Sequence, residues 1–256
     1  MKATAIIQAR FSASRLHGKV LFKVLDKTIL EYVIERVKIA KMIDEVIIAT
    51  TVNDEDSKIE DLAKRIGIKV YRGSESDVLD RYYQAAKAFN VKHIVRITAD
   101  CPLIDPDIID GVLELYFKSR ADYCSNTLDI TFPDGEDVEV FSFGSLEQAW
   151  KKADLLSERE HVTPFINKHP KLFKLESYKS KTDLSEKRWT LDEKKDYEFI
   201  KSVIEGLYPK KPDFGINDVL ELLKINPRLE ETNKGIERNE GYQKSLRNDR
   251  KVKIQK

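Results

Sequence analysis

The chain has 256 residues, of which 35% are charged, and its 45 basic and 44 acidic side chains leave a net charge of +1. This near-neutral balance gives no basis for binding nucleic acid or an anionic membrane through overall charge, so we expect neither partner. The length predicts one α/β domain with a small appendage.

The cysteines and the N-terminus favour a cytoplasmic protein. Cys101 and Cys124 are too few for a disulfide framework or a thiolate metal site, so a reducing compartment is the simplest expectation. The first apolar stretch is short and ends at Arg10, which fits neither a signal peptide nor a membrane span. We therefore expect a cytoplasmic location.

Apolar runs alternate with amphipathic stretches through the first half of the chain. The expected strands are Thr4–Ala9, Glu45–Thr50, Lys69–Tyr71 and His93–Thr98. The expected helices are Ile29–Ala40, Asp54–Ile66, Val78–Phe89 and one from Asp105 to about Lys118. This order predicts a mostly parallel central sheet with helices on both faces. Ligands of such sheets bind beyond the carboxyl ends of the strands.

The second half is less regular. The expected strands are Val138–Phe141, Phe173–Tyr178 and Arg188–Leu191. The expected helices are Leu146–Ala153, Glu160–Asn167, Lys195–Glu205 and Val219–Leu223. Pro209, Pro212 and Gly215 mark a linker, so residues 1–208 are expected to form the main domain and 209–256 a polar, partly helical C-terminal extension. Apolar residues are sparse from Arg238 onward, and no packed core is expected there.

The loop after the first expected strand is the most informative segment. It carries three cations, Arg10, Arg15 and Lys19, among the small residues Ser12, Ala13, Ser14 and Gly18. Backbone amides can approach an anion where side chains are small, and fixed cations neutralise it. The loop therefore predicts a polyphosphate site, and the alternative is a solvated basic turn.

Two carboxylates follow expected strands. Asp100 comes two residues after the end of His93–Thr98, and Asp192 directly after Arg188–Leu191. Carboxylates at strand ends suit Mg²⁺, which usually takes one or two of them and completes its shell with water and phosphate. The alternatives are a turn or helix start for Asp100 and a helix N-cap for Asp192.

Ordered motifs then carry a resemblance to a known family. They are Gln8-Ala9-Arg10, Ser14-Arg15-Leu16, Gly18-Lys19-Val20, Arg72-Gly73-Ser74, Asp77–Tyr82, Arg96–Asp105, Asp137–Phe141, Arg159–Pro164 and Arg188–Asp192. The series resembles the cytidylyltransferases, most closely the spore-coat polysaccharide biosynthesis branch. It is more distantly similar to the enzymes that activate 3-deoxy-manno-octulosonate and acylneuraminate. The match covers roughly residues 3–205.

The resemblance implies a nucleotide-diphospho-sugar transferase-like fold and Mg²⁺-dependent transfer of a cytidylyl group from CTP to a sugar or sugar acid, with release of pyrophosphate, for surface glycan synthesis. It implies Arg10, Lys19 and Asp100 as catalytic residues, and Asp100 and Asp192 as metal ligands. The implied nucleotide-binding residues are Arg10, Ser12, Ser14, Arg15, Lys19, Arg72, Ser74 and Asp77. The implied sugar-binding residues are Asp137, Glu139, Arg159, Glu160 and His161.

Three of the sugar-side residues allow alternatives. His161 is a candidate general base, and the alternative is a packing or hydrogen-bonding residue within a helix. Asp137 and Glu139 alternate along a strand and point to opposite faces, so only one of them is expected to face the sugar.

The chain also departs from the family pattern. Ser12-Ala13 stands where the family usually has Gly-Ser, and His17 where it commonly has Pro, which leaves the nucleotide preference open. The alternatives are a transferase that uses another nucleoside triphosphate or a non-sugar acceptor, and a nucleotide-binding protein without turnover. A glycosyltransferase is a further alternative by fold, but Asp100-Cys101-Pro102 lacks the second carboxylate of its usual metal motif.

Oligomeric state and the role of the tail stay open. Relatives in the family commonly form dimers, and Pro133–Glu136 is a candidate segment for a homodimer interface. Three possibilities stay open for the polar tail after Pro209: it covers the cleft, it binds a partner, or it has neither role.

Overall fold

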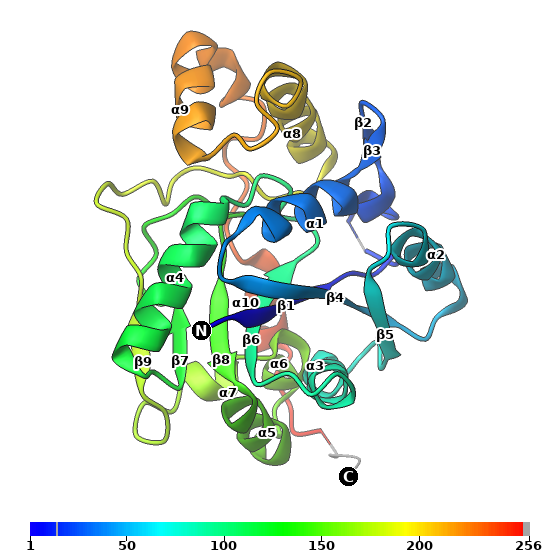
Figure 1. Ribbon diagram of the computed structural model, residues 1–256, viewed down its shortest axis with the longest axis vertical. Helices are drawn as coiled ribbons and strands as arrows, with labels where there is room; N and C mark the ends of the chain where they lie inside the picture. Colours follow the sequence, from blue (N-terminus) through cyan, green and yellow to red (C-terminus); the bar gives the residue numbers. More distant parts are fainter. Residues whose placement is uncertain (14, 253–256) are drawn as a thin grey trace.

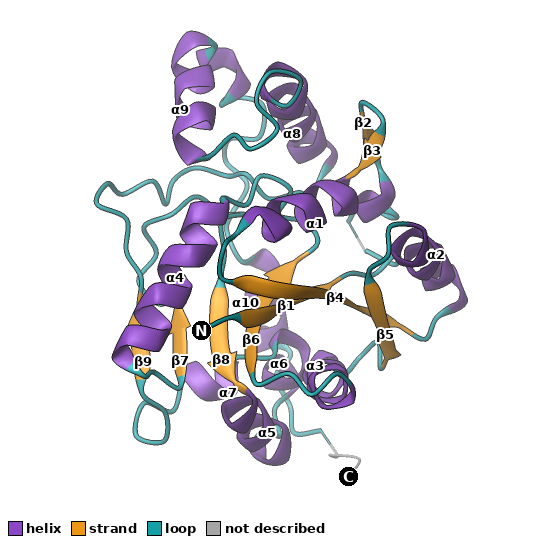
Figure 2. Cartoon of the chain, viewed as in Figure 1, coloured by secondary structure: helices purple, strands orange, loops and turns teal. Residues whose placement is uncertain are grey.

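The computed structural model describes residues 1–13 and 15–252, and within them a central sheet has the strand order β5-β4-β1-β6-β8-β7-β9 (Figures 1 and 2). Its strands are β1 (Ala3–Gln8), β4 (Ile43–Thr51), β5 (Lys69–Gly73), β6 (His93–Thr98), β7 (Tyr123–Ser125), β8 (Glu139–Ser142) and β9 (Leu175–Ser177). A small ribbon, β2 (Lys23–Val24) with β3 (Lys27–Thr28), stands apart from it.

The sheet is mostly parallel, as the sequence predicts. Strands β5, β4, β1 and β6 run in one direction, whereas β8 is antiparallel to both β6 and β7. The central position of β1 explains why the apolar residues Ala5, Ile6 and Ile7 are consecutive, because Ile6 and Ile7 point to opposite faces and both are fully buried.

Helices cover both faces of this sheet (Figure 1). Those on one face are α1 (Ile29–Ile39), α2 (Ser57–Arg65) and α4 (Pro106–Ser119). Those on the other are α3 (Val78–Ala88), α5 (Phe143–Lys152), α6 (Leu156–His161) and α7 (Pro164–Asn167). The predicted fold class is therefore confirmed. No helix of the described ranges is long and apolar enough to cross a bilayer.

The helix expected over Glu160–Asn167 is wrong, because the chain forms two helices, α6 and α7, with a break between them. Val162 has φ 72° at this break. Pro164 begins α7, and a proline there cannot donate the amide bond that would continue α6. The break leaves Glu160 and His161 in the last turn of α6.

The strand expected at Arg188–Leu191 is also wrong. This segment makes one isolated bridge, between Asp134 and Arg188, and its other backbone bonds go to loops. The Leu191 amide donates to the Asp100 carbonyl at 2.8 Å. The segment is apolar because Trp189 and Leu191 pack on α8 (Lys194–Leu207) and α9 (Ile216–Ile225), which form a third core cluster beside the sheet.

The C-terminal segment is folded onto the rest of the chain. After η3 (Pro227–Leu229) it returns to the sheet and forms α10 (Glu240–Arg247), which packs on α6 (Figure 1). The short 3₁₀ turns η1 (Lys19–Leu21) and η2 (Asp54–Asp56) lie near the N-terminal loop. Polar contacts rather than apolar ones hold the C-terminal segment after η3 against the rest of the chain, since Asn233 and Ser245 are buried and hydrogen-bonded. The proposed division at residue 208 stays a prediction, although α8 and α9 share a core cluster across it.

Candidate active site

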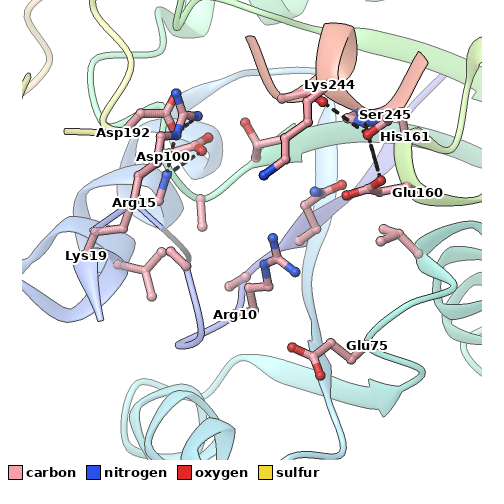
Figure 3. A pocket seen from close by; sticks show the side chains of 18 of the residues that line it. Arg10, Arg15, Lys19, Glu75, Asp100, Glu160, His161, Asp192, Lys244 and Ser245 are labelled. Atoms are coloured by element: carbon pink, nitrogen blue, oxygen red, sulfur yellow. Dashed lines mark hydrogen bonds and ion pairs between the residues drawn. The ribbon is translucent and has the colours of Figure 1, made fainter. Parts of the chain in front are cut away.

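A cavity of about 730 Å³ lies beyond the carboxyl ends of β1 and β6, where the sequence predicts a ligand site (Figure 3). This volume suits a small-molecule ligand. Its lining includes Gln8, Ala9 and Arg10 after β1, Arg15 and Lys19 from the following loop, Glu75 and Arg81, Thr98–Asp100 after β6, Glu160 and His161 of α6, Asp192, and Glu240, Gly241, Lys244, Ser245 and Asn248 at the C-terminus.

Gly18 sets the shape of the cationic loop. Its φ is +71°, and its amide donates to the Phe11 carbonyl at 2.9 Å. A Cβ at this position would lie 2.9 Å from the Phe11 ring, so the turn requires glycine. Lys19 is the next residue, and its buried side chain lines the cavity wall. Ser14, which the resemblance places in the nucleotide site, lies outside the described residues.

Lys19 joins the two carboxylates that were singled out as metal ligands. Its Nζ lies 2.9 Å from Asp100 Oδ2, 2.8 Å from Asp192 Oδ1 and 2.6 Å from the Leu191 carbonyl oxygen. All three ammonium donors are therefore used. Burial acts to lower the pKa of Lys19, but Asp100 and Asp192 outweigh it and raise that pKa above its ordinary value.

The same cluster keeps Asp100 ionised. Burial acts to raise the pKa of Asp100, but the Lys19 ammonium and a hydrogen bond from Thr98 lower it to about 2. Asp192 also contacts two arginines, with Arg15 Nη2 at 2.9 Å from Oδ1 and Arg188 Nη2 at 3.3 Å from Oδ2. Cations thus surround this pair of carboxylates on the loop side of the cavity.

The donor set fits a divalent cation bound through few protein ligands. Asp100 and Asp192 converge on one ammonium, so both carboxylates can reach a single cation. In the described part of the chain no group of three or more His, Cys, Asp or Glu side chains has the arrangement of a metal site. Mg²⁺ commonly binds one or two protein carboxylates and completes its coordination with water and phosphate, whereas Zn²⁺ sites are usually built from His and Cys ligands.

A second polar cluster forms the opposite wall. The Ser245 hydroxyl donates to Glu160 Oε2 at 2.7 Å and lies 3.0 Å from His161 Nε2. Because a hydroxyl has one proton, a Ser245 that donates to Glu160 accepts from His161 Nε2–H. Burial outweighs the effect of Glu160 and lowers the pKa of His161 to about 4, so its imidazole is neutral near pH 7.

Asp77 and Arg159 lie outside the cavity lining and fasten α3 to α6. The Arg159 Nε lies 3.0 Å from both carboxylate oxygens of Asp77, and its Nη1 donates to the Trp150 carbonyl at 2.8 Å. Asp77 also caps α3 by accepting from the Asp80 amide at 2.9 Å. This geometry gives the pair a structural role.

Asp137 and Glu139 are likewise not among the lining residues. Glu139 is buried in an ion pair with Arg96 and accepts from the Tyr123 hydroxyl at 2.7 Å. Its ion-pair partner Arg96 contacts the lining residue Gln8, with Arg96 Nε 3.2 Å from Gln8 Oε1. Asp137 accepts from Arg238 Nη2 at 2.6 Å. The expectation that one of them faces the cavity therefore finds no support in the geometry.

Three residues expected at the nucleotide also have partners elsewhere. Arg72 donates to the carbonyls of Thr51 at 2.9 Å and Asn53 at 2.7 Å. Ser74 Oγ accepts from the Asp77 amide at 3.0 Å. Ser12 approaches the cavity indirectly, through a 2.8 Å hydrogen bond to Glu75 Oε1.

Sequence reasoning missed Glu75, Arg81 and the wall formed by α10. Arg81 stands in a motif that had been noted, so its place in the lining could have been anticipated. The α10 residues gave only the weak signal of Tyr242 and Leu246, spaced one turn apart in a polar stretch. The candidate dimer segment Pro133–Glu136 is buried within this chain and offers no exposed surface.

Comparison with known proteins agrees with this fold and cavity. A solved structure of a cytidylyltransferase from Leptospira borgpetersenii superposes with a TM-score of 0.86 and 37% identity, covering 93% of this chain and all of that one (100%). The fold is thus that of a nucleotidyltransferase. The family model described as cytidylyltransferase matches residues 4–225, and the chain belongs to this family.

Curated relatives extend the comparison. The uncharacterized protein MJ1063 of Methanocaldococcus jannaschii is 40% identical over 92% of this chain and 96% of its own. The spore coat polysaccharide biosynthesis protein SpsF of Bacillus subtilis is 33% identical over 87% and 94%. The 3-deoxy-manno-octulosonate cytidylyltransferase of Solibacter usitatus is 40% identical over 54% and 53%. The resemblance identified from the motifs is therefore confirmed, and the protein is an enzyme of the nucleotidyltransferase class.

Proposed function

We propose that the protein transfers a cytidylyl group from CTP to a hydroxyl of a sugar or sugar acid, with Mg²⁺ as cofactor, for a surface glycan. The acceptor oxygen forms a bond to the α-phosphorus, the bond from that phosphorus to the oxygen bridging to the β-phosphate breaks, and pyrophosphate leaves while the hydroxyl proton passes to solvent. Family membership supports the use of CTP. The names of SpsF and the 3-deoxy-manno-octulosonate enzymes support a sugar acceptor.

The observation that carries the proposal is the meeting of Lys19 with Asp100 and Asp192 at the edge of a cavity that Arg10 and Arg15 also line (Figure 3). A polyphosphate substrate needs cations to offset its charge, and transfer needs stabilisation of the leaving pyrophosphate. The cations of this loop would offset the phosphate charge and stabilise the leaving pyrophosphate, and the neighbouring carboxylates would hold the metal ion.

In this proposal Arg10, Arg15 and Lys19 hold the triphosphate. Asp100 and Asp192 would hold Mg²⁺, which when bound neutralises phosphate charge and makes the phosphorus more electrophilic. Lys19 already carries a fixed positive charge between the carboxylates, so it is placed to offset the charge that develops on the leaving group.

Glu160 and His161 form the acceptor side. A neutral imidazole with a pKa of about 4 is a weak base near pH 7, so His161 orients the acceptor by hydrogen bonding rather than removing its proton. Glu160 holds Ser245, which in turn fixes the His161 ring.

The nucleotide assignment is tested by supplying each of the four nucleoside triphosphates with Mg²⁺ and a panel of sugars and sugar acids, and measuring pyrophosphate. We expect release that depends on an acceptor and is at least about tenfold faster with CTP than with the others. Faster release with another triphosphate would reassign the nucleotide. Binding of CTP without pyrophosphate from any acceptor would favour a nucleotide-binding protein.

A further inference from the structure

The cavity wall formed by α10 lies outside the region that the family model matches. The match to the family model ends at residue 225, whereas five residues beyond it line the cavity: Glu240, Gly241, Lys244, Ser245 and Asn248. We propose that α10 is an acceptor-selecting element and that the Lys244 ammonium binds an anionic group, carboxylate or phosphate, of the acceptor. This inference rests on the proposed function of the cavity as a nucleotidyl transfer site.

The helix is docked at both ends. At its N-terminus Glu240 Oε2 lies 2.9 Å from Arg15 Nη1 in the cationic loop. Just beyond its C-terminus Asp249 accepts from the Ser157 amide at 3.0 Å and from the Ser157 hydroxyl at 2.8 Å. Tyr242 also packs edge-on against His161, with ring centroids 4.9 Å apart. These contacts hold one face of α10 toward the cavity.

That face is defined by helical spacing. Gly241, Lys244, Ser245 and Asn248 follow the pattern i, i+3, i+4, i+7 and all line the cavity. Lys244 extends from α10 into the open space, and Arg10 points into the same space from the opposite wall (Figure 3). Gly241, without a side chain, leaves room beside Lys244.

Lys244 differs in one respect from the other lysine of the cavity. Lys19 is bound to two carboxylates, whereas among residues 1–13 and 15–252 the Lys244 Nζ has no hydrogen-bond or ion-pair partner. A cation that faces a ligand cavity without a carboxylate partner favours an anion there. The ligand, rather than the protein, would neutralise it.

The neighbours of Lys244 place that anion on the acceptor side. Ser245, the next residue, contacts Glu160 and His161, the residues assigned to the acceptor. Two of the three cations assigned to the triphosphate, Arg15 and Lys19, instead contact Asp192, and Lys19 also contacts Asp100. The acceptor's anionic group and the nucleotide phosphates would thus meet different cations of one cavity.

Equilibrium binding by calorimetry tests the inference with four probes: 3-deoxy-manno-octulosonate as a carboxylate, glucose 1-phosphate as a phosphate, glucose as a neutral sugar, and CTP. The variants are Lys244→Gln, Lys244→Arg and the matched control Arg247→Gln, which removes a positive charge from the same helix at a residue outside the cavity lining. We expect wild type to bind one anionic sugar at least about tenfold more tightly than glucose.

Lys244→Gln should weaken that binding at least about tenfold, Lys244→Arg should recover most of it, and Arg247→Gln and CTP affinity should stay within about twofold of wild type. The sugar that responds distinguishes carboxylate from phosphate. Weakened CTP binding with unchanged sugar binding would overturn the inference, as would equal effects of Lys244→Gln and Arg247→Gln, or no preference for either anionic sugar. These readouts do not require turnover, so they separate failure of this inference from failure of the transferase assay.

Discussion

Lys19 is the residue on which the site depends most. Its side chain is 9% exposed and its ammonium contacts both Asp100 and Asp192, so its removal would leave carboxylate charge with less compensation in a partly buried place. Removing one member of a buried ion pair costs more than the pair contributes, because the remaining charge has lost its partner. The Lys19 side chain thus stabilises the folded protein even in the absence of a substrate.

Lys19→Met should lower the free energy of unfolding by about 3 kcal/mol at pH 7, measured by urea denaturation. Adding Asp100→Asn should restore part of the loss, since the unpaired charge is then removed. If Lys19→Met is as stable as wild type, the charges of Asp100 and Asp192 are already compensated by Arg15 and Arg188.

His161 makes stability depend on pH. Its pKa is about 4 in the folded protein and about 6.5 in an unfolded chain, so between these values the unfolded state binds more protons. The free energy of unfolding should therefore fall as pH drops from 6.5 to 4. His161→Gln keeps a donor for Ser245 and should make this fall less steep, as measured by urea denaturation at several pH values. An unchanged slope in the variant would contradict the assignment of a neutral, half-buried imidazole to His161.

At the scale of elements, the cationic loop and α10 are linked by the Arg15–Glu240 ion pair, which spans 225 positions of sequence. Arg15 is also the loop residue proposed to contact the triphosphate. If Arg15 contacts the triphosphate as proposed, Glu240 would compete with phosphate for its guanidinium. The side chains are 34% and 58% exposed, so solvent weakens the pair and the effect should be modest.

Glu240→Gln should tighten CTP binding by about two- to fivefold, because Arg15 no longer has to leave a carboxylate. Calorimetry measures the affinity, and Glu237→Gln is the matched control, since Glu237 is exposed and lies outside the cavity lining. Weaker CTP binding in Glu240→Gln would instead show that docking of α10 organises the nucleotide site.

The elements that could be predicted are those fixed by apolar burial. The run in β1 and the periodic faces of α1 to α4 carry their burial in their own sequence. The conformation of Arg188–Leu191 could not be predicted, because its apolar residues pack on α8 and α9 instead of in the sheet, and α10 could not be predicted because polar bonds to distant residues hold it, such as Ser157 to Asp249. The local hydrophobic periodicity of a sequence gives no information about such distant partners.

The site divides in the same way. Arg10, Lys19 and Asp100 follow strands whose carboxyl ends meet, so the sequence could place them together. Arg159 and Glu139 share the motifs of the family but are turned into the protein, and their orientation depends on Asp77 and Arg96. Side-chain direction was the information that the motifs lacked.

At the scale of the whole molecule, a chain with net charge of +1 concentrates opposite charges in one cavity. The ends of β1 and β6 supply Arg10 and Asp100, α6 supplies a polar wall with Glu160 and His161, and α10 lines a further side. In the proposed function, this arrangement would bring a polyphosphate and a second substrate together in one cavity, as transfer between them requires.

The central claim is tested most directly by pyrophosphate release from CTP with Mg²⁺ and a sugar or sugar-acid acceptor, comparing wild type with Asp100→Asn. Asp107→Asn is the control, because Asp107 is exposed and outside the cavity lining. We predict acceptor-dependent release by wild type and Asp107→Asn, and a loss of at least about 100-fold in Asp100→Asn. Undiminished release by Asp100→Asn would contradict the account.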